Sequence, residues 1–292
     1  MTPAARRVPE QGPEQGLLPG MPTRLFTCTP TRLTTHLDCP RRYRLTYLDR
    51  PSPPRGPASA HTSVGAAVHL ALARWWGEPL VRRTPGRAGE LVRRAWPASW
   101  SSAGFRDAEQ SAEHAERAVA AVTAYAEELD PARGPVGVER TVATRTATLA
   151  VSGRVDRIDA RDDELVVVDY KLGRREPTAA VARTSLALGL YAVATARTLR
   201  RPCTRVELHH VPSGTVAVAE HDEASLARKV AEAESIARDV VTATGALAAG
   251  ADPDEAFPAT PSSLCAWCDV RPACPVGRAH VPAAEPWAAL AP

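Results

Sequence analysis

Two acidic residues and a lysine lie near the ends of two neighbouring predicted strands. Asp156 belongs to the segment G-R-V-D-R-I-D at 153–159, and Asp169 and Lys171 follow an apolar run of three valines. A turn near Asp162 would pair these strands and bring both carboxylates to the same end of a sheet. Carboxylates that converge in apolar surroundings repel each other unless a hard cation lies between them, so the spacing predicts a Mg²⁺ or Mn²⁺ site.

Lys171 stands two residues after Asp169, which places both side chains on the same face of a strand. In such a position a lysine can hold and deprotonate a water, or stabilise the charge of a phosphoryl transition state. An alternative is that Asp159 and its neighbours Asp162 and Asp163 are turn residues and that Asp156 pairs with an arginine. The pattern D-x-K is short enough to occur by chance, so both interpretations stay open on spacing alone.

A second group of residues with chemical potential is the cysteine set near the C-terminus. Cys265, Cys268 and Cys274 follow a C-x₂-C-x₅-C spacing, which is one thiolate short of a tetrahedral set. Four cysteines suit zinc as well as an iron–sulfur centre, and the simplest alternative is that they are buried small residues. Cys28 and Cys203 have no partner at ligand spacing and are expected to be ordinary cysteines.

The elements that would position these residues follow from hydrophobic periodicity and from capping and turn residues. Helices are expected at 32–48, interrupted at Cys39–Pro40, from Thr62 or Ser63 to Trp76, at 87–95 and at 107–129. Strands are expected at 136–145, 146–160 and 164–171, a helix at 178–199, a hairpin at 205–211 and 215–220, and a helix at 223–247. This order predicts an α/β fold with a central mixed sheet flanked by helices and preceded by a helical part at about 30–130.

Length and composition limit the number of domains, the kind of partner and the location that can be expected. The 292 residues, 44% of them hydrophobic, can form one substantial core. The net charge of +3, from 36 basic and 33 acidic residues, is too balanced to indicate a nucleic-acid binder. There is no long apolar run that would cross a membrane and no secretory pattern, so a cytoplasmic protein is expected, in which cysteines ligate metal or are buried. Residues 1–22 are expected to be disordered, with Met21 as an alternative start.

Taken together, the motifs resemble the RecB-like branch of the PD-(D/E)XK nucleases. G-R-V-D-R-I-D and V-V-D-Y-K-L-G are similar to motifs II and III of that branch, and V-G-A-A-V-H, which ends at His69, is similar to its G-x-x-x-H helix. The resemblance implies a restriction-endonuclease-like core. It also implies that His69, Asp156, Asp169 and the backbone carbonyl of Tyr170 bind the divalent metal, while Lys171 assists the attacking water. Some relatives add a strand glutamate, for which Glu139 is the candidate.

One position departs from the family pattern. Relatives usually carry a Gln-x-x-x-Tyr helix, whereas here Tyr191 is present and Ala187 stands at the Gln position. Tyr191 is therefore either a residue that contacts DNA or a core aromatic.

The resemblance also bears on the cysteines. Cys39, in C-P-R-R-Y, matches the cysteine that relatives carry ahead of the nuclease motifs, so Cys39, Cys265, Cys268 and Cys274 are expected to hold a [4Fe–4S] cluster, with Zn²⁺ as the alternative. Such a link between the two ends of a domain at 23–276, followed by a tail at 277–292, would restrict the unfolded chain and stabilise the fold by several kcal/mol.

Arginines beside the cysteines and the acids could form a basic track for phosphates, although charged residues mostly solvate surfaces. The candidates are Arg41, Arg42, Arg154, Arg157 and Arg174. The function expected is a Mg²⁺- or Mn²⁺-dependent deoxyribonuclease. It would be an exonuclease directed at single strands or ends, in repair, recombination or CRISPR-type defence, with a possible helicase or CRISPR-adaptation partner. The alternative is a non-catalytic DNA-binding scaffold stapled by iron–sulfur or zinc.

Overall fold

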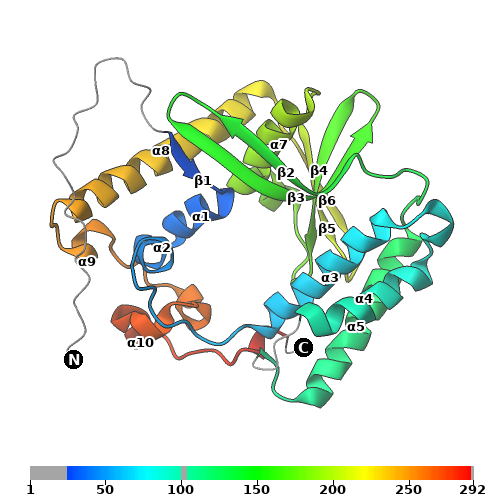
Figure 1. The fold of residues 1–292 in the computed structure, drawn as a ribbon, viewed down its shortest axis with the longest axis horizontal. Coiled ribbons are helices and arrows are strands. Elements are labelled where there is room, and N and C mark those ends of the chain that lie inside the picture. Colours follow the sequence, from blue (N-terminus) through cyan, green and yellow to red (C-terminus); the bar gives the residue numbers. More distant parts are fainter. Residues whose placement is uncertain (1–24, 100–103, 291–292) are drawn as a thin grey trace, which may run out of the picture.

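The computed structural model describes residues 25–99 and 104–290. A mixed six-stranded sheet lies in this part of the chain, with the order β1-β3-β4-β5-β6 and with β2 paired to β3 (Figure 1). The strands are β1 Phe26–Cys28, β2 Gly137–Arg145, β3 Leu149–Arg161, β4 Glu164–Lys171, β5 Arg205–His210 and β6 Val216–Glu220. β1 is parallel to β3 and β4 is parallel to β5, whereas the other pairs are antiparallel. The predicted mixed sheet is confirmed.

The two edges of β3 are paired differently. On one edge β2 accompanies β3 over residues 150–158. On the other edge β1 pairs with residues 149–151 and β4 with residues 157–161. Among the described strands none pairs with residues 152–156 on this second edge, so the sheet opens there, and Asp156 lies where the opening meets β4.

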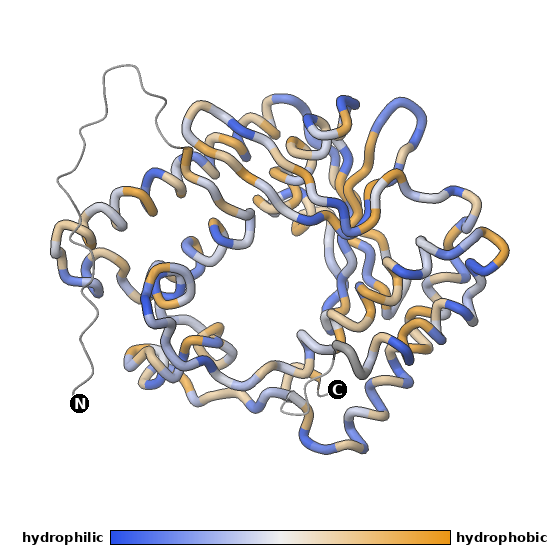
Figure 2. The backbone as a smooth tube through the Cα atoms, viewed as in Figure 1, coloured by the Kyte–Doolittle hydropathy of each residue, from blue (hydrophilic) through white to orange (hydrophobic). Residues whose placement is uncertain are grey.

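Helices cover both faces of the sheet. On one face, α3 Ala60–Gly77, α4 Pro85–Ser99 and α5 Ala108–Glu127 share a core with Val166, Val168 and Tyr170 of β4. On the other face, α6 Ala179–Thr184 and α7 Leu186–Leu199 pack on Val167 and its neighbours. Hydrophobic residues, orange in Figure 2, recur along these strands and helices. Because β4 is covered on both faces, its run of valines is wholly buried.

A third core joins β1 to α1 Pro30–Asp38, α2 Pro40–Tyr47 and α8 Glu223–Ala248. Cys39 ends α1 and begins α2 in an extended conformation, as expected for a residue before proline. The chain then continues through α9 Pro253–Ala256 to short helices at Ser263–Trp267, Arg271–Ala273 and α10 Pro275–His280, and a last turn at Ala288–Leu290. The interruption predicted at Cys39–Pro40 is confirmed.

Some boundaries differ from the prediction. The helix expected at 178–199 is two helices, because Ser185 leaves the helical region and its hydroxyl accepts a hydrogen bond from the Leu188 amide. α3 begins at Ala60, earlier than predicted, since the Ala60 amide donates to the carbonyl of Pro286. Strand β1 was not predicted. Residues 1–22 and Met21 lie outside the described residues, and the described part of the predicted tail at 277–292 includes the end of α10 and the turn at Ala288–Leu290.

No described helix combines the length and apolar character needed to cross a bilayer.

Candidate active site

Side chains from three elements converge beside the opening in the sheet. His69 comes from α3, Glu139 from β2 and Asp156 from β3, and one ligand atom of each lies within 4.8 Å of the other two. His69 Nδ1 is 3.3 Å from Asp156 Oδ1. Asp156 Oδ2 accepts a hydrogen bond of 2.9 Å from the amide of Tyr170. Strands β3 and β4 are no longer paired at this point, so the Tyr170 amide has no backbone partner on β3. The side chain of Asp156 accepts its hydrogen bond instead.

Asp169 and Lys171 reach the same region from β4. The β3–β4 register runs to Arg157 opposite Val168, so Asp156 and Asp169 are the next residues on their strands. Lys171 Nζ lies 2.6 Å from Asp169 Oδ2. The lysine side chain is about half exposed and the aspartate largely buried. The ammonium therefore lies between a buried carboxylate and solvent.

The backbone of Glu139 has an unusual φ angle, which accompanies the position of its side chain in the cluster. Its neighbours Val138 and Arg140 pair with Arg157 and Val155, so Glu139 faces Asp156 across the two strands. Its φ is 46°, in the left-handed region that costs a non-glycine residue about 1–2 kcal/mol. This conformation accompanies the approach of its carboxylate to His69 and Asp156. Arg154 Nε, 2.7 Å from Glu139 Oε2, compensates part of the charge.

The negative charges of the cluster are only partly compensated by Lys171 and Arg154. Burial raises the pKa of Asp169, and the charge of Asp156 raises it further, against the lowering effect of Lys171. Burial likewise raises the pKa of Glu139, with Asp156 adding to the rise. Burial lowers the pKa of His69, but the hydrogen bond and the charge of Asp156 outweigh it, so that this pKa lies above its ordinary value.

This donor set fits a hard divalent cation. Carboxylate oxygens with one imidazole are ligands that Mg²⁺ or Mn²⁺ accepts, and a cation would offset the burial and the mutual repulsion that raise the pKa values of Asp169 and Glu139. His69, Glu139 and Asp156 could hold it, with Asp169 beside them. Tyr170, whose carbonyl the family resemblance assigns to the metal, donates its amide hydrogen to Asp156.

Two tyrosines frame the cluster. The buried ring of Tyr170 meets the ring of His69 edge-on at 5.7 Å, and its hydroxyl accepts a hydrogen bond from Trp76 Nε1. Tyr191 of α7 lies over Gly153, where an added Cβ would come within 2.6 Å of Cε1 of the tyrosine ring. Burial raises the pKa of Tyr191, and the charges of Asp169 and Asp156 add to this rise. Tyr191 is thus half-buried beside the acids.

Two of the five arginines of the predicted basic track are buried, and the other three are partly or well exposed. The guanidinium of Arg157 is 4% exposed, lies 2.9 Å from Asp159 and stacks on Trp76, so it stabilises the core and is not available to a phosphate. Arg41 is also buried and pairs with Asp254 at 2.8 Å. By contrast, Arg42, Arg154 and Arg174 are partly or well exposed.

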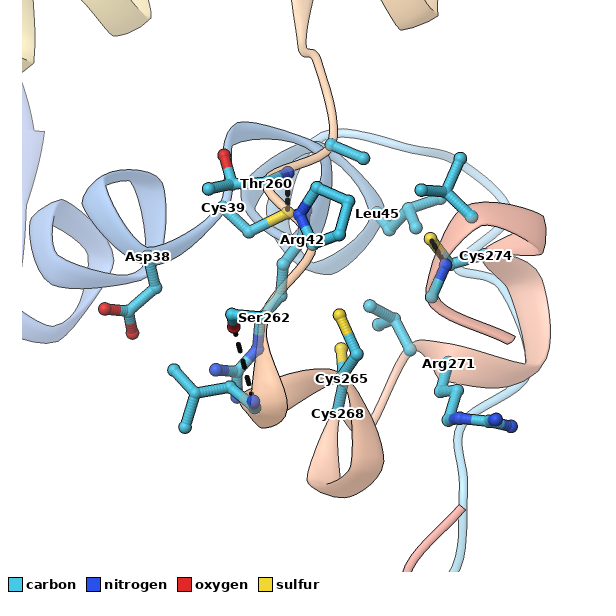
Figure 3. A pocket seen from close by; sticks show the side chains of 16 residues that line it. Asp38, Cys39, Arg42, Leu45, Thr260, Ser262, Cys265, Cys268, Arg271 and Cys274 are labelled. Carbon is cyan, nitrogen blue, oxygen red and sulfur yellow. Dashed lines mark hydrogen bonds between the residues drawn. The ribbon is translucent and has the colours of Figure 1, made fainter. Parts of the chain in front are cut away.

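The four predicted cysteine ligands meet at one site. Cys39, Cys265, Cys268 and Cys274 line a single pocket between α2 and the loops around α10 (Figure 3). Cys39 Sγ accepts hydrogen bonds from the amides of Arg42 and Thr260, and Cys274 Sγ accepts one from the Gly277 amide. Amide hydrogen bonds to sulfur are the contacts that surround cysteines ligating an iron–sulfur cluster, so this arrangement fits a metal centre. Cys28 and Cys203 lie elsewhere in the cores.

A buried polar network behind the site was not predicted. Glu207 and His209 of β5 bond to each other at 2.9 Å, and Tyr125 of α5 bonds to the other ring nitrogen of His209 at 2.7 Å. Arg161 and Arg205 complete the pairing of Glu207. The alternation of polar residues in β5 could have indicated that Glu207 and His209 share one face of the strand. An alternating strand normally turns its polar face to water, however, so their burial was not expected.

A comparison with protein families places the chain that carries this fold and acidic cluster in a known superfamily. Residues 27–275 match the PD-(D/E)XK nuclease superfamily. A comparison with curated proteins gave no match.

Proposed function

Since the chain belongs to the PD-(D/E)XK nuclease superfamily, whose members typically cleave phosphodiesters, we propose that it is a metal-dependent deoxyribonuclease of the RecB-like type. The observation that carries the proposal is the convergence of His69, Glu139 and Asp156 beside the Asp169–Lys171 pair. The substrate class is DNA with single-stranded regions or ends, and the setting is the cytoplasm. Repair, recombination and CRISPR-type defence are the processes in which such an activity would serve, with a helicase or adaptation protein as partner.

The chain's own residues account for binding and orientation. The bond to Asp156 and the edge of the Tyr170 ring fix the imidazole of His69, and the Tyr170 amide fixes Asp156 in turn. Bound there, Mg²⁺ or Mn²⁺ would act as a Lewis acid toward the scissile phosphate. Lys171 can donate a proton or a hydrogen bond on the solvent side of the site, because Asp169 holds it while its side chain stays half exposed.

We also propose that the four cysteines hold a [4Fe–4S] cluster, with Zn²⁺ as the alternative occupant. Support comes from their common pocket and from the amide donors to Cys39 and Cys274. Anaerobically purified protein with a cluster absorbs visible light through charge transfer from thiolate to iron, whereas a zinc protein is colourless. Iron, sulfide and zinc analysis separates the two.

A second candidate, a DNA-binding scaffold without turnover, is favoured by Ala187. This residue lies one helical turn before Tyr191 on α7, where relatives carry a glutamine. The scaffold would retain the fold and the cysteine site.

Cleavage of end-labelled single- and double-stranded DNA in Mn²⁺ tests these proposals. We expect the wild type to cut, and Asp169→Ala and Lys171→Ala to bind DNA but lose cleavage by about 100-fold or more, a typical effect of removing one catalytic group. Arg133→Ala, an exposed residue of another surface, is the matched control and should cut normally. If the wild type with its metal centre intact binds but cuts no substrate, the scaffold function replaces the nuclease.

A further inference from the structure

A second groove borders the cysteine pocket and has no role in the proposed chemistry. It encloses about 820 Å³ between the 266–272 loop, residues 55–59 and the start of α3. Hydrogen bonds tie its walls together: the Gly56 amide donates to the Asp269 carbonyl, and the Ala284 amide to the Ala266 carbonyl. The groove and the cysteine pocket share Arg42, Cys268 and Arg271.

The groove is connected to the catalytic cluster by one stripe of α3. Thr62 and Ala66 line the groove, and His69 reaches Asp156; these residues are spaced i, i+4 and i+7, so they lie on one side of the helix. Thr62 is about 10 Å from His69 along the helix axis, a span of a few nucleotides. Gly65 and Ala66, both small, lie between them, and a Cβ at Gly65 would meet nothing within 4 Å, so a strand could approach the helix closely.

Charge and aromatic surface in the groove suit a nucleic-acid strand. Its walls contain three arginines, Arg42, Arg55 and Arg271, and a single acid, Asp269. Asp269 is shared, since it lies 3.3 Å from Arg42 and 2.8 Å from Arg55. Trp267 also lines the groove, and 46% of its surface is exposed. A large exposed aromatic beside incompletely neutralised arginines is the combination with which proteins bind single strands by stacking and phosphate contact.

We propose that this groove is a base-stacking subsite for the DNA strand whose phosphate lies at the catalytic cluster. Trp267 stacks on one base, and Arg55 contacts a phosphate of the same strand. The inference rests on the proposed nuclease function for the identity of the ligand. Binding to the groove can be measured whether or not the chain cleaves DNA.

The test is the affinity of the holoprotein for a short oligo(dT), measured by fluorescence anisotropy without divalent metal. We expect Trp267→Leu to weaken binding by roughly 5- to 100-fold, the range for loss of one stacked base. Trp267→Phe keeps an aromatic face and should stay within a few-fold of the wild type. Arg55→Gln should weaken binding and lower the salt dependence by about one counterion, whereas Arg50→Gln, an exposed arginine outside the groove, should change neither.

A second measurement starts from the unaltered protein, because Trp267 adjoins Cys268 and a substitution there can disturb the metal centre. A single abasic nucleotide is moved along the oligonucleotide, and one position should weaken binding more than the others. In Trp267→Leu with unchanged metal content, that position should lose its effect. Equal sensitivity at every position, or a Trp267→Leu variant that binds like the wild type, overturns the subsite. Tighter, Trp267-dependent binding of oligo(U) overturns its assignment to DNA.

Discussion

Glu139 is held at a φ of 46° opposite Asp156, and burial raises the pKa of its carboxyl. Both features destabilise the metal-free protein, one through the backbone and the other through burial of the carboxylate, to which the charge of Asp156 adds. Strained residues of this kind occur where function requires the placement. At this residue, stability and metal binding are therefore expected to oppose each other.

Glu139→Gly tests this opposition. Glycine adopts positive φ without strain, so the variant should unfold at a higher temperature in EDTA, with a gain of about 1 kcal/mol. Its affinity for Mn²⁺, measured by calorimetry, should fall because one ligand is missing. Arg200→Gly, at a φ of 56° at the end of α7 and away from the acids, is the control: it should gain stability in EDTA without a change in Mn²⁺ affinity. A Glu139→Gly variant that is less stable in EDTA, or that binds Mn²⁺ like the wild type, would contradict the assignment of Glu139.

Glu207 carries the pH dependence that the structure predicts most directly. It is 1% exposed. Burial raises the pKa of its carboxyl, but hydrogen bonds from His209, Arg161 and Arg205 outweigh this effect and hold the pKa far below the ordinary 4.5. A carboxyl with a depressed folded-state pKa stabilises the protein fully above the unfolded-state pKa. That stabilisation is lost progressively as pH falls from 4.5 toward the folded-state pKa.

Glu207→Gln should therefore destabilise the protein by about 1.5–3 kcal/mol at neutral pH, because the charge-assisted hydrogen bonds from the partly exposed Arg161 and Arg205 are weakened. Its stability should also decline less steeply than that of the wild type below pH 4.5. Urea unfolding over a pH series measures both effects. Glu220→Gln, at the exposed end of the same ion-pair chain, should have neither. Parallel acid profiles for the wild type and Glu207→Gln would show that other groups control acid unfolding.

At the scale of elements, the contact between β3 and α7 determines how the acids meet Tyr191. A methyl group at Gly153 would lie 2.6 Å from Tyr191 Cε1 and 3.3 Å from Pro30 Cδ. The strand and the two helices can approach as they do only because residue 153 has no side chain.

Gly153→Ala should destabilise the protein by about 1–3 kcal/mol through overpacking. In the double variant with Tyr191→Ala, the loss should be smaller than the sum of the two single losses, because the clash has been removed. Thermal unfolding of the four proteins completes the cycle. Gly245→Ala on α8, where a Cβ meets nothing, is the control and should be neutral or stabilising. Additive losses would place the origin of the destabilisation elsewhere.

The elements show what periodicity can and cannot predict. The long helices and the three central strands were predicted within a few residues, because each buries one regular face. The three-residue β1 has no period to detect and exists only because β3 lies beside it. Asp156 and Asp169 were placed together by turn and register, whereas the burial of Arg157 was missed, since its partners Trp76 and Tyr125 come from helices distant in sequence. The left-handed conformation of Glu139 had no sequence signal.

At the scale of the molecule, the cysteine pocket joins the start of the fold to its end. Cys39 lies between β1 and β2 in the chain, and the other three cysteines follow β6, the last strand. A metal centre would close a loop of almost the whole described chain, which corresponds to a stabilisation on the order of 5 kcal/mol in the chain-entropy treatment of cross-links.

Cys39→Ser should lose metal and a comparable part of the free energy of unfolding. Denaturation of anaerobically prepared protein, combined with metal analysis, provides the measurement. Cys203→Ala is the control, since burial raises the pKa of Cys203 to about 12 and keeps it an unreactive thiol outside the pocket. Its metal content should equal that of the wild type. Full metal content and stability in Cys39→Ser would exclude Cys39 as a ligand.

The contact between Ala60 and Pro286 imposes an order on the protein's synthesis. α3, which bears His69, leaves the ribosome long before Pro286, whose carbonyl accepts hydrogen bonds from the Ala60 amide and the Ser59 hydroxyl. A nascent chain can therefore assemble its sheet and acids while the first turn of α3 still lacks its partner. The helix that presents the histidine is completed only after residues 275–290 have been translated and have folded back across the molecule.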